Sequence, residues 1–414
     1  MDVGEIEALS LLQDQQDAEF VSVETKLQMA PQDDLVAIFR ALSGFSCMKQ
    51  CFVKKIVSLP ARALAAIISR QSLLQFLYLQ NVSLSGEQED FDSLAQAFRH
   101  HTGLRKIRLY MFRPSISTST CLDSVVSAIA AIPCLEEVSL IHSKLIVADA
   151  EEQKPWDGKC LLDLCKARNL KMLTLTFSTE LNDNHIGDIS KALQTNKSIK
   201  NVSIRSNNLG KDAGVAVGRL LKSNSKLERL RLQLSQDDHA VPIVEALHEN
   251  TNLQRLGLVL PRRENDKRLH LTDKLADMLR KSNYNLVQMD LVGLTNNVEE
   301  ILFFLKVNQA GRKRLLSQGA ARDQWVQTLI SHNDDLSVMF YFLSKNPTLC
   351  LVLLRRMIAL SSVERVGTSE TRSALLPELS TTNYRKRLHP PGVSSENEES
   401  EKSEGRFIKK AKNC

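Results

Sequence analysis

Residues 199–209 read Ile-Lys-Asn-Val-Ser-Ile-Arg-Ser-Asn-Asn-Leu, and the spacing of their aliphatic side chains is the strongest structural signal in the chain. Apolar residues stand at the first, fourth, sixth and eleventh places of this stretch, and an asparagine stands at the ninth. Val202 and Ile204 are separated by one residue, as in a strand that buries one of its two faces. The stretch therefore predicts a short strand followed by a turn.

The same arrangement recurs along the chain with a nearly constant period. A leucine or isoleucine is followed three and five residues later by further aliphatic residues, and successive copies start 26 to 35 residues apart. The clear copies start at Leu74, Leu104, Leu135, Leu170, Ile199, Leu227, Leu253 and Leu286, and a weaker copy starts at Met48. Such a period is typical of a repeat protein in which each repeat forms one structural unit.

Between the predicted strands the apolar spacing changes to that of a helix. Ile186, Ile189 and Leu193 fall on one helical face, and other repeats show the same pattern. Several of these helices end three residues before an asparagine, and the next strand pattern starts three residues after it, as at Asn196 and Asn224. Because asparagine tolerates the left-handed conformation, we expect this residue to close the helix by adopting it.

A strand plus a full helix in about 28 residues resembles the leucine-rich-repeat proteins of the ribonuclease-inhibitor-like superfamily. The resemblance covers residues 48–308. It implies an α/β solenoid, a horseshoe of eight or nine strand-helix repeats with a parallel sheet on its concave face and helices outside. The superfamily is functionally broad, so the resemblance implies binding rather than one activity.

The pattern also suggests how the chain is divided. We predict a flexible N-terminus at residues 1–31 and the solenoid, with a short N-terminal helical cap, at residues 32–308. A solenoid needs its last apolar face covered, so the helical pattern of residues 309–360 predicts a C-terminal helical cap. Residues 361–414 are rich in Ser, Glu and Lys and are predicted to be a disordered tail.

Composition narrows the function classes. The chain has 414 residues, a formal net charge of +6 and only 5% aromatic residues, which fits an aliphatic solenoid and mildly favours acidic partners. No basic segment followed by an apolar run opens the chain, and no apolar stretch is long enough to cross a bilayer, so we expect no membrane association. The eight cysteines lack metal-ligand spacing, so we expect reduced thiols, no metal and no cofactor.

The predicted strands place their alternate residues on the concave face, where two groups stand out. The first group holds Phe52, Phe76, Tyr78, Lys106, Arg108 and Tyr110, and the second holds Arg205, Arg229, Arg231 and Arg255. Aromatic residues and arginine dominate the energetics of interfaces, so we expect these residues to contact an acidic protein partner. Two other arrangements remain open: the aromatic side chains pack on a cap, or the arginines pair with Glu137, Glu228 or Asp290.

The motifs of the common enzyme classes are absent from the sequence. It contains no phosphate loop, dinucleotide fingerprint, metalloprotease helix or nucleophile elbow, so we expect a non-enzymatic scaffold. We expect a monomer, because both ends of the solenoid are predicted to be capped. Two alternatives stay open. The superfamily that the chain resembles also includes activators of a small GTPase, and Arg205 beside Asn207 and Asn208 is the nearest residue set for such a regulator. The arginines suggest a nucleic-acid adaptor, although no continuous basic stripe with stacking aromatic residues supports it.

The tail carries two basic clusters that flank an acidic serine run. The first is Arg385, Lys386 and Arg387, and the second is Lys409, Lys410 and Lys412. Their arrangement resembles a long-spaced bipartite nuclear signal, and a solvated charged tail is the alternative. We therefore expect a cytoplasmic protein for which the nucleus is a second possible location.

Overall fold

The computed structural model describes residues 19–24, 32–45, 47–56, 58–111, 113–114, 119–141, 158–177, 181–207, 209–261, 269–292, 298–316 and 320–351. The chain divides into two compact units, Met1–Asn346 and Pro347–Cys414. Every element discussed below belongs to the first unit. Of the predicted C-terminal regions, residues 352–360 and the tail at residues 361–414 lie outside the described residues.

The first unit is built on a ten-stranded sheet in which every strand pairs in parallel with its neighbours. All nine predicted strands are present, and each begins two residues after the aliphatic residue that starts its copy of the pattern. They are β2 (Gln50–Lys54), β4 (Phe76–Gln80), β6 (Lys106–Tyr110), β8 (Glu137–Ile141), β9 (Met172–Thr176), β10 (Asn201–Arg205), β11 (Arg229–Gln233), β12 (Arg255–Val259) and β13 (Gln288–Val292).

The tenth strand corrects the prediction of a flexible N-terminus. β1 (Phe20–Glu24) lies within the segment predicted as flexible, and it pairs with β2 along its whole length. Val21 is buried against the core. The five residues of β1 stand alone in the sequence, without the repeat spacing that identifies the other strands, so the strand was not predicted. Pairing with β2 fixes the position of β1 in the sheet, and the residue pattern of β1 alone does not.

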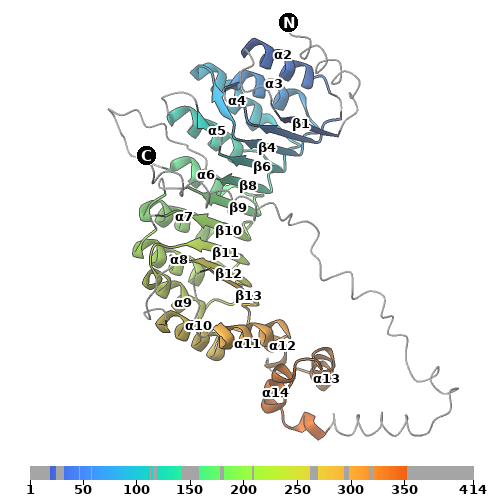
Figure 1. The fold of residues 1–414 in the computed structure, drawn as a ribbon, viewed down its shortest axis with the longest axis vertical. Coiled ribbons are helices and arrows are strands. Elements are labelled where there is room, and N and C mark those ends of the chain that lie inside the picture. The colour runs from blue at the N-terminus through green and yellow to red at the C-terminus, as the bar shows by residue number, and fades with distance from the viewer. Residues whose placement is uncertain are drawn as a thin grey trace, which may run out of the picture. The chain divides into compact units, whose positions relative to one another are not determined.

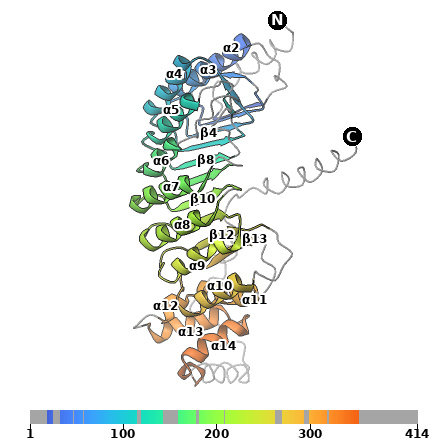
Figure 2. The ribbon, with the colours of Figure 1, turned by 90° about the vertical axis from the view of Figure 1, so that its left-hand side faces the viewer.

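The helices lie along one face of the sheet (Figures 1 and 2). They are α2 (Gln32–Leu42), α3 (Ala61–Arg70), α4 (Gln88–His100), α5 (Ser119–Ala130), α6 (Lys159–Lys166), α7 (Asp183–Thr195), α8 (Lys211–Ser223), the short η1 (Asp237–Ala240), α9 (Val241–Leu247), α10 (Leu269–Lys281) and α11 (Val298–Gln309). A second, three-stranded sheet joins β3 (Leu59–Pro60), β5 (Ser83–Ser85) and β7 (Arg113–Pro114). The strand-helix alternation is that of an α/β repeat solenoid.

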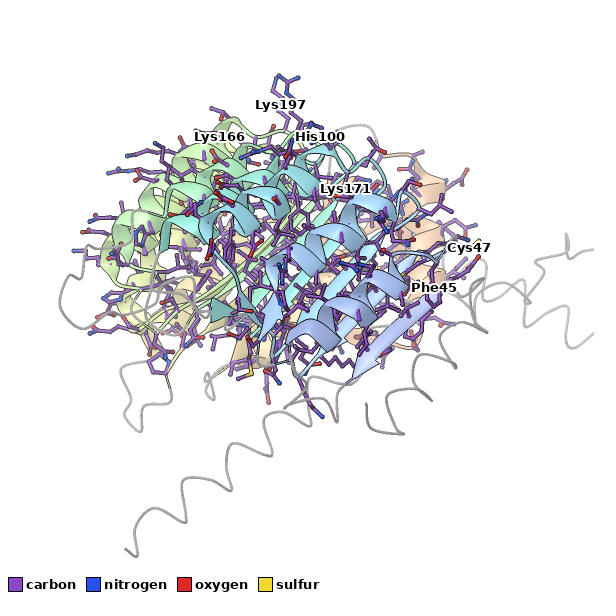
Figure 3. The ribbon with its side chains drawn as sticks, turned by 90° about the horizontal axis from the view of Figure 1, so that it is seen from above. Phe45, Cys47, His100, Lys166, Lys171 and Lys197 are labelled. Carbon is purple, nitrogen blue, oxygen red and sulfur yellow. The ribbon has the colours of Figure 1, made fainter. Side chains whose placement is uncertain are left out.

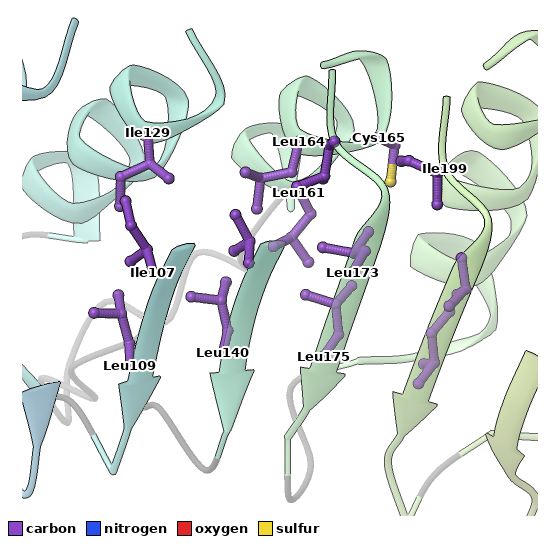
Figure 4. Packing of buried hydrophobic residues seen from close by; sticks show 14 of the residues in the cluster. Ile107, Leu109, Ile129, Leu140, Leu161, Leu164, Cys165, Leu173, Leu175 and Ile199 are labelled. Atoms are coloured by element: carbon purple, nitrogen blue, oxygen red, sulfur yellow. The ribbon is translucent and has the colours of Figure 1, made fainter. Parts of the chain in front are cut away.

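The core runs between the sheet and the helices and consists almost entirely of aliphatic side chains. In Figure 4, Leu140 of β8 and Leu173 of β9 point toward Leu161 and Leu164 of α6, and all four are fully buried. Each of these leucines stabilises the fold by roughly 1.5–3 kcal/mol relative to an exposed position. The remaining strand residues point to the opposite face of the sheet, which we call the open face.

The recurring asparagines work differently from the expectation. Asn196 and Asn224 follow α7 and α8 in extended conformation, with φ of −74° and −84°, so they do not close the helix in the left-handed region. Instead, the Nδ2 group of Asn224 donates to the Leu193 carbonyl of the preceding repeat at 2.6 Å. Its Oδ1 accepts from the N–H groups of Lys226 and Leu227 in its own turn. The side chain therefore joins two repeats.

This arrangement extends along the unit as a ladder of buried polar side chains, each linking a turn to the repeat before it. Its asparagine members are Asn196, Asn224, Asn250, Asn283 and Asn308. Figure 3 shows the edge at which the helices end, where His100, Lys166 and Lys197 are labelled. The ladder satisfies buried carbonyl and amide groups that helix ends leave without partners.

Two other residue types fill the ladder near the N-terminus. Gln71 donates to the carbonyls of Leu42 and Ser43. In His101, Nε2 bonds the Gln71 carbonyl, and Nδ1 accepts from the N–H groups of Gly103 and Leu104 at 3.0 Å each. These contacts place the proton on Nε2, and burial lowers the pKa of His101 below its usual value.

After β13 the predicted helical cap follows as α12 (Arg312–Leu316), α13 (Arg322–Ser331) and α14 (Leu336–Lys345). Arg312 anchors it: its guanidinium donates to the carbonyls of Leu279 and Arg280, the last turn of α10, at 2.6 Å each. The same group lies over the Tyr284 ring, 4.1 Å from its centre. A buried cation at the negative end of a helix is favourable, so Arg312 ties the cap to the last repeats.

Two smaller expectations concern membranes and thiols. Within the described ranges, no helix has the length and apolar character needed to span a bilayer. Cys51, Cys160 and Cys165 are buried as free thiols in the core, as predicted. Burial raises the pKa of Cys51 and Cys165 to about 12, so both remain protonated and serve as small apolar side chains.

Candidate functional site

The strand register fixes which residues are neighbours on the open face. Side chains alternate in burial along β10, where Val202 and Ile204 are buried and the residues between them are partly exposed. The middle residues of successive strands pair across the whole sheet and form one row. From β1 to β13 this middle row is Ser22, Phe52, Tyr78, Arg108, Ser139, Thr174, Ser203, Arg231, Gly257 and Asp290.

An aromatic patch occupies the N-terminal strands of this face. We use this name for Phe20, Phe52, Phe76 and Tyr78, whose ring centres lie 4.8 to 6.4 Å apart for the contacting pairs. Tilted and edge-on pairs at these separations are the favourable geometries for aromatic rings. Phe20 is 55% exposed and was not predicted, because it belongs to the strand that sequence analysis missed. The rings pack on one another, and no described helix covers them.

The predicted cations beside this patch share one carboxylate. Arg108 donates through Nε and Nη2 to Oε1 of Glu137, at 3.0 and 2.7 Å, and Lys106 lies 3.5 Å from Oε2 of the same carboxylate. The Arg108 guanidinium also lies 5.7 Å from the centre of the Phe76 ring. Tyr110 ends the same strand, half-buried. Glu137 therefore offsets one of the two positive charges on this strand.

The arginine patch lies further along the sheet and has no such counterpart. We use this name for Arg229 and Arg231 of β11 and Arg255 of β12, in which Arg229 and Arg255 are direct cross-strand partners. Cross-strand partners are about 5 Å apart, so like charges face each other directly. Among the described residues, no carboxylate lies within ion-pair distance of these three arginines. Three guanidinium groups thus remain available for an external anion.

The two carboxylates that might have paired with them are engaged elsewhere. Glu228 forms an ion pair with Lys200 at 2.7 Å. Asp290 accepts a hydrogen bond from Gln288 of its own strand at 3.3 Å. Arg205 has an interaction of its own, so we do not include it in the arginine patch. The structure therefore brings together three of the four predicted arginines as an uncompensated group.

Two buried polar atoms at this patch lack a partner within the described residues: Nε of Arg231 and Oδ1 of Asn201. The stem of Arg231 leans over Gly257 so closely that a Cβ built on Gly257 would lie 2.9 Å from its Cγ. Glycine at this position is what lets the stem lie flat.

Small hydroxyl residues separate the two patches. The middle row passes through Ser139, Thr174 and Ser203 on β8, β9 and β10. Ser139 is buried and the other two are partly exposed. The middle row therefore carries short side chains on β8, β9 and β10, and Arg108 of β6 stands between them and the aromatic patch.

The remaining predicted sites fall outside this face. The six basic residues of the possible nuclear signal, Arg385, Lys386, Arg387, Lys409, Lys410 and Lys412, lie outside the described residues. Over the part of the chain that the structure covers, no three His, Cys, Asp or Glu side chains come together in a way that would hold a metal ion.

Of three comparisons with known proteins, only the one with solved structures finds similar chains. No protein-family model matches the sequence, and no curated protein matches it. Among solved structures, the yeast Rad7 and Elc1 complex aligns at 12% identity with a TM-score of 0.41, covering 74% of this chain and 73% of that one. Leiomodin-1 actin-binding site 2 aligns at 16% identity with a TM-score of 0.31, covering 39% of this chain and 94% of that one. On its own strand order and register, this chain is an α/β repeat solenoid.

Proposed function

We propose that the chain is a non-enzymatic scaffold that binds an acidic protein surface through the open face of its sheet. The observation that carries this proposal is the arginine patch, whose three guanidinium groups have no carboxylate partner among the described residues. Guanidinium groups bind carboxylates through paired hydrogen bonds, and desolvated arginines are frequent contributors of binding energy. The proposal includes no catalytic step, and it treats the chain as a monomer of the ribonuclease-inhibitor-like type.

The charge distribution favours a protein over a nucleic acid as the partner. A nucleic acid needs positive charge along a continuous track, with aromatic side chains on which bases stack. Here Arg108 and Lys106 share the Glu137 carboxylate, and hydroxyl side chains on β8, β9 and β10 separate them from the arginine patch. The positive charge along the middle row is therefore interrupted between β6 and β11. A local acidic cluster on a protein surface matches this better than a phosphate backbone does.

The test is affinity capture of partners from native extract, followed by mass spectrometry. The variant Arg229→Glu/Arg231→Glu reverses the charge of the patch. We expect it to lose a partner that the wild type retains. We also expect capture by the wild type to fall as salt concentration rises, because exposed charges are screened.

The matched control is Lys197→Glu/Arg219→Glu, which changes the net charge equally. Both residues are exposed on the helix side: Arg219 lies in α8, and Lys197 follows α7 (Figure 3). The control should capture the same partner as the wild type. The proposal would be overturned if Arg229→Glu/Arg231→Glu captured the partner as well as the wild type does. It would also be overturned if both variants lost the partner to the same extent.

A further inference from the structure

The two patches and the surface between them form one line across the sheet. The middle row runs perpendicular to the strands, from Phe52 and Tyr78 in the aromatic patch to Arg231 in the arginine patch. We propose that the partner binds as a single extended segment along this row, with an apolar anchor on the aromatic patch and a carboxylate on the arginine patch. This inference rests on the proposed function and specifies the form of the ligand.

The length of the segment follows from the strand count. Tyr78 on β4 and Arg231 on β11 are separated by five strand-to-strand steps. At about 4.8 Å per step, this is roughly 24 Å, and an extended chain advances about 3.3 Å per residue. The two anchors should therefore stand about seven residues apart in the partner's sequence.

The surface between the anchors suits an extended backbone. Between Tyr78 and Arg231 the row passes Arg108, whose guanidinium is held by Glu137, and then the short side chains of Ser139, Thr174 and Ser203. An extended chain lies close to such a floor, and its amide and carbonyl groups reach the hydroxyl groups below.

The arginine patch indicates what the ligand supplies there. Arg229 and Arg255 are exposed and Arg231 is partly exposed. Among the described residues, none of the three has a carboxylate within ion-pair distance. A carboxylate side chain of the bound segment accepts hydrogen bonds from these guanidinium groups.

The two anchors are not interchangeable. Around the aromatic patch, Arg108 and Lys106 already share the Glu137 carboxylate, so a second carboxylate gains less there than at the arginine patch. The partly exposed rings of Phe76 and Tyr78 instead gain by burying an apolar side chain. The order of anchors along the row is thus fixed by the chemistry of the protein.

The test uses synthetic fluorescent peptides with one Trp and one Glu-Glu pair, joined by Gly/Ser spacers of two, seven or fourteen residues. Binding to the full chain is measured by fluorescence anisotropy at low salt. A spacer of two residues cannot reach both patches, and affinity falls slowly once the spacer exceeds the span. We expect the seven-residue spacer to bind about tenfold tighter than the two-residue spacer, and the fourteen-residue spacer to bind between them.

Two variants show whether both patches are used at once. Tyr78→Ser removes a partly exposed ring of the aromatic patch, and Arg231→Gln removes a charge while keeping much of the stem. Each variant should lower the affinity for the peptide with the seven-residue spacer severalfold. The affinity for the peptide with the two-residue spacer should fall in one variant but not in both, because that peptide reaches only one patch. Circular dichroism and the unfolding midpoint confirm that each variant is folded.

Equal affinity for all three spacers, or no binding by any of them, would overturn the two-anchor inference. These outcomes leave the proposed function separately testable, because that proposal depends on the capture of a natural partner. If Arg229→Glu/Arg231→Glu abolishes capture while spacer length has no effect, the open face binds an acidic surface that is not an extended segment. If capture is unaffected, both proposals fail.

Discussion

His101 takes the place in the ladder that asparagine holds in later repeats, and unlike asparagine it can be protonated. Its ring makes the contacts that asparagine makes in later repeats, bonding the Gln71 carbonyl and accepting from Gly103 and Leu104. An asparagine has no proton to gain in the ordinary pH range. A histidine does, and protonation at Nδ1 would remove the acceptor that holds the turn.

We therefore predict that His101 makes the stability of the chain depend on pH. Burial lowers its pKa below the unfolded value of 6.5, so the folded state favours the neutral ring. The contribution is complete above pH 6.5 and is lost as pH falls below it, because the unfolded state then binds more protons. Urea unfolding of wild type and His101→Asn at pH 7.5 and 5.5 measures this.

The variant should lose less stability than the wild type between the two pH values. His101→Ala serves as the control, since it removes both the proton and the hydrogen bonds and should be destabilised at either pH. If wild type and His101→Asn respond equally to pH, the histidine does not titrate as described.

Arg312 gives a second prediction at this scale. Its guanidinium makes two hydrogen bonds to the end of α10 and lies over Tyr284, so a single ammonium group cannot replace it. Arg312→Lys should lower the free energy of unfolding by roughly 2–3 kcal/mol, from the loss of charged hydrogen bonds. Lys313→Ala, at the exposed neighbouring position, should change it by less than about 0.5 kcal/mol. Similar values for the two variants would show that Arg312 does not anchor the cap.

At the scale of the element, the asparagine ladder replaces the usual means of ending a helix. Helices leave their last carbonyls without partners, and many proteins satisfy them with a left-handed residue. Here Asn224 reaches from one repeat to the carbonyl of Leu193 in the preceding one. Each turn is thereby joined to the repeat before it, in addition to the strand hydrogen bonds.

The ladder predicts that loss of a single asparagine side chain strongly lowers the stability of the fold. Asn224→Ala removes bonds to the Leu193 carbonyl and to the N–H groups of Lys226 and Leu227, all of which stay buried or partly buried. We expect a loss of roughly 2–4 kcal/mol in the free energy of unfolding, measured by urea denaturation. Lys226→Ala, in the same turn but exposed, should have little effect. A loss below about 1 kcal/mol in Asn224→Ala would contradict the role given to the ladder.

The elements also show where sequence analysis succeeded. The strand positions followed from aliphatic spacing, because each strand must bury the same face in every repeat. The asparagines were recognised as recurrent, yet their mechanism was misjudged, since a side-chain bond between residues 31 positions apart leaves no trace in local sequence. β1 was missed for a related reason: its pairing with β2 is set by the fold around it.

At the scale of the molecule, the positions of the charged residues say more about the partner than the net charge does. The net charge of +6 gave only a mild preference for acidic partners. The structure separates the predicted cations into two groups, because Glu137 lies beside Arg108 and Lys106, and no described carboxylate pairs with the arginine patch. From the sequence, the arginines could contact an acidic partner or pair with Glu137, Glu228 or Asp290. The strand register brings Glu137 to Arg108 and leaves the arginine patch without a described carboxylate partner.

The central claim is that the open face, and not the helix side, contacts the partner. Incorporating a photocrosslinking amino acid at Ser203, beside Arg231 on the open face, tests it directly in native extract, where the partner is present at its natural concentration. The same amino acid at Arg219, exposed on α8, is the matched position on the helix side. We predict a crosslinked partner from position 203 that disappears when Arg229→Glu/Arg231→Glu is added, and none from position 219. Crosslinking from position 219 alone, or crosslinking from position 203 that survives the charge reversal, would contradict the account.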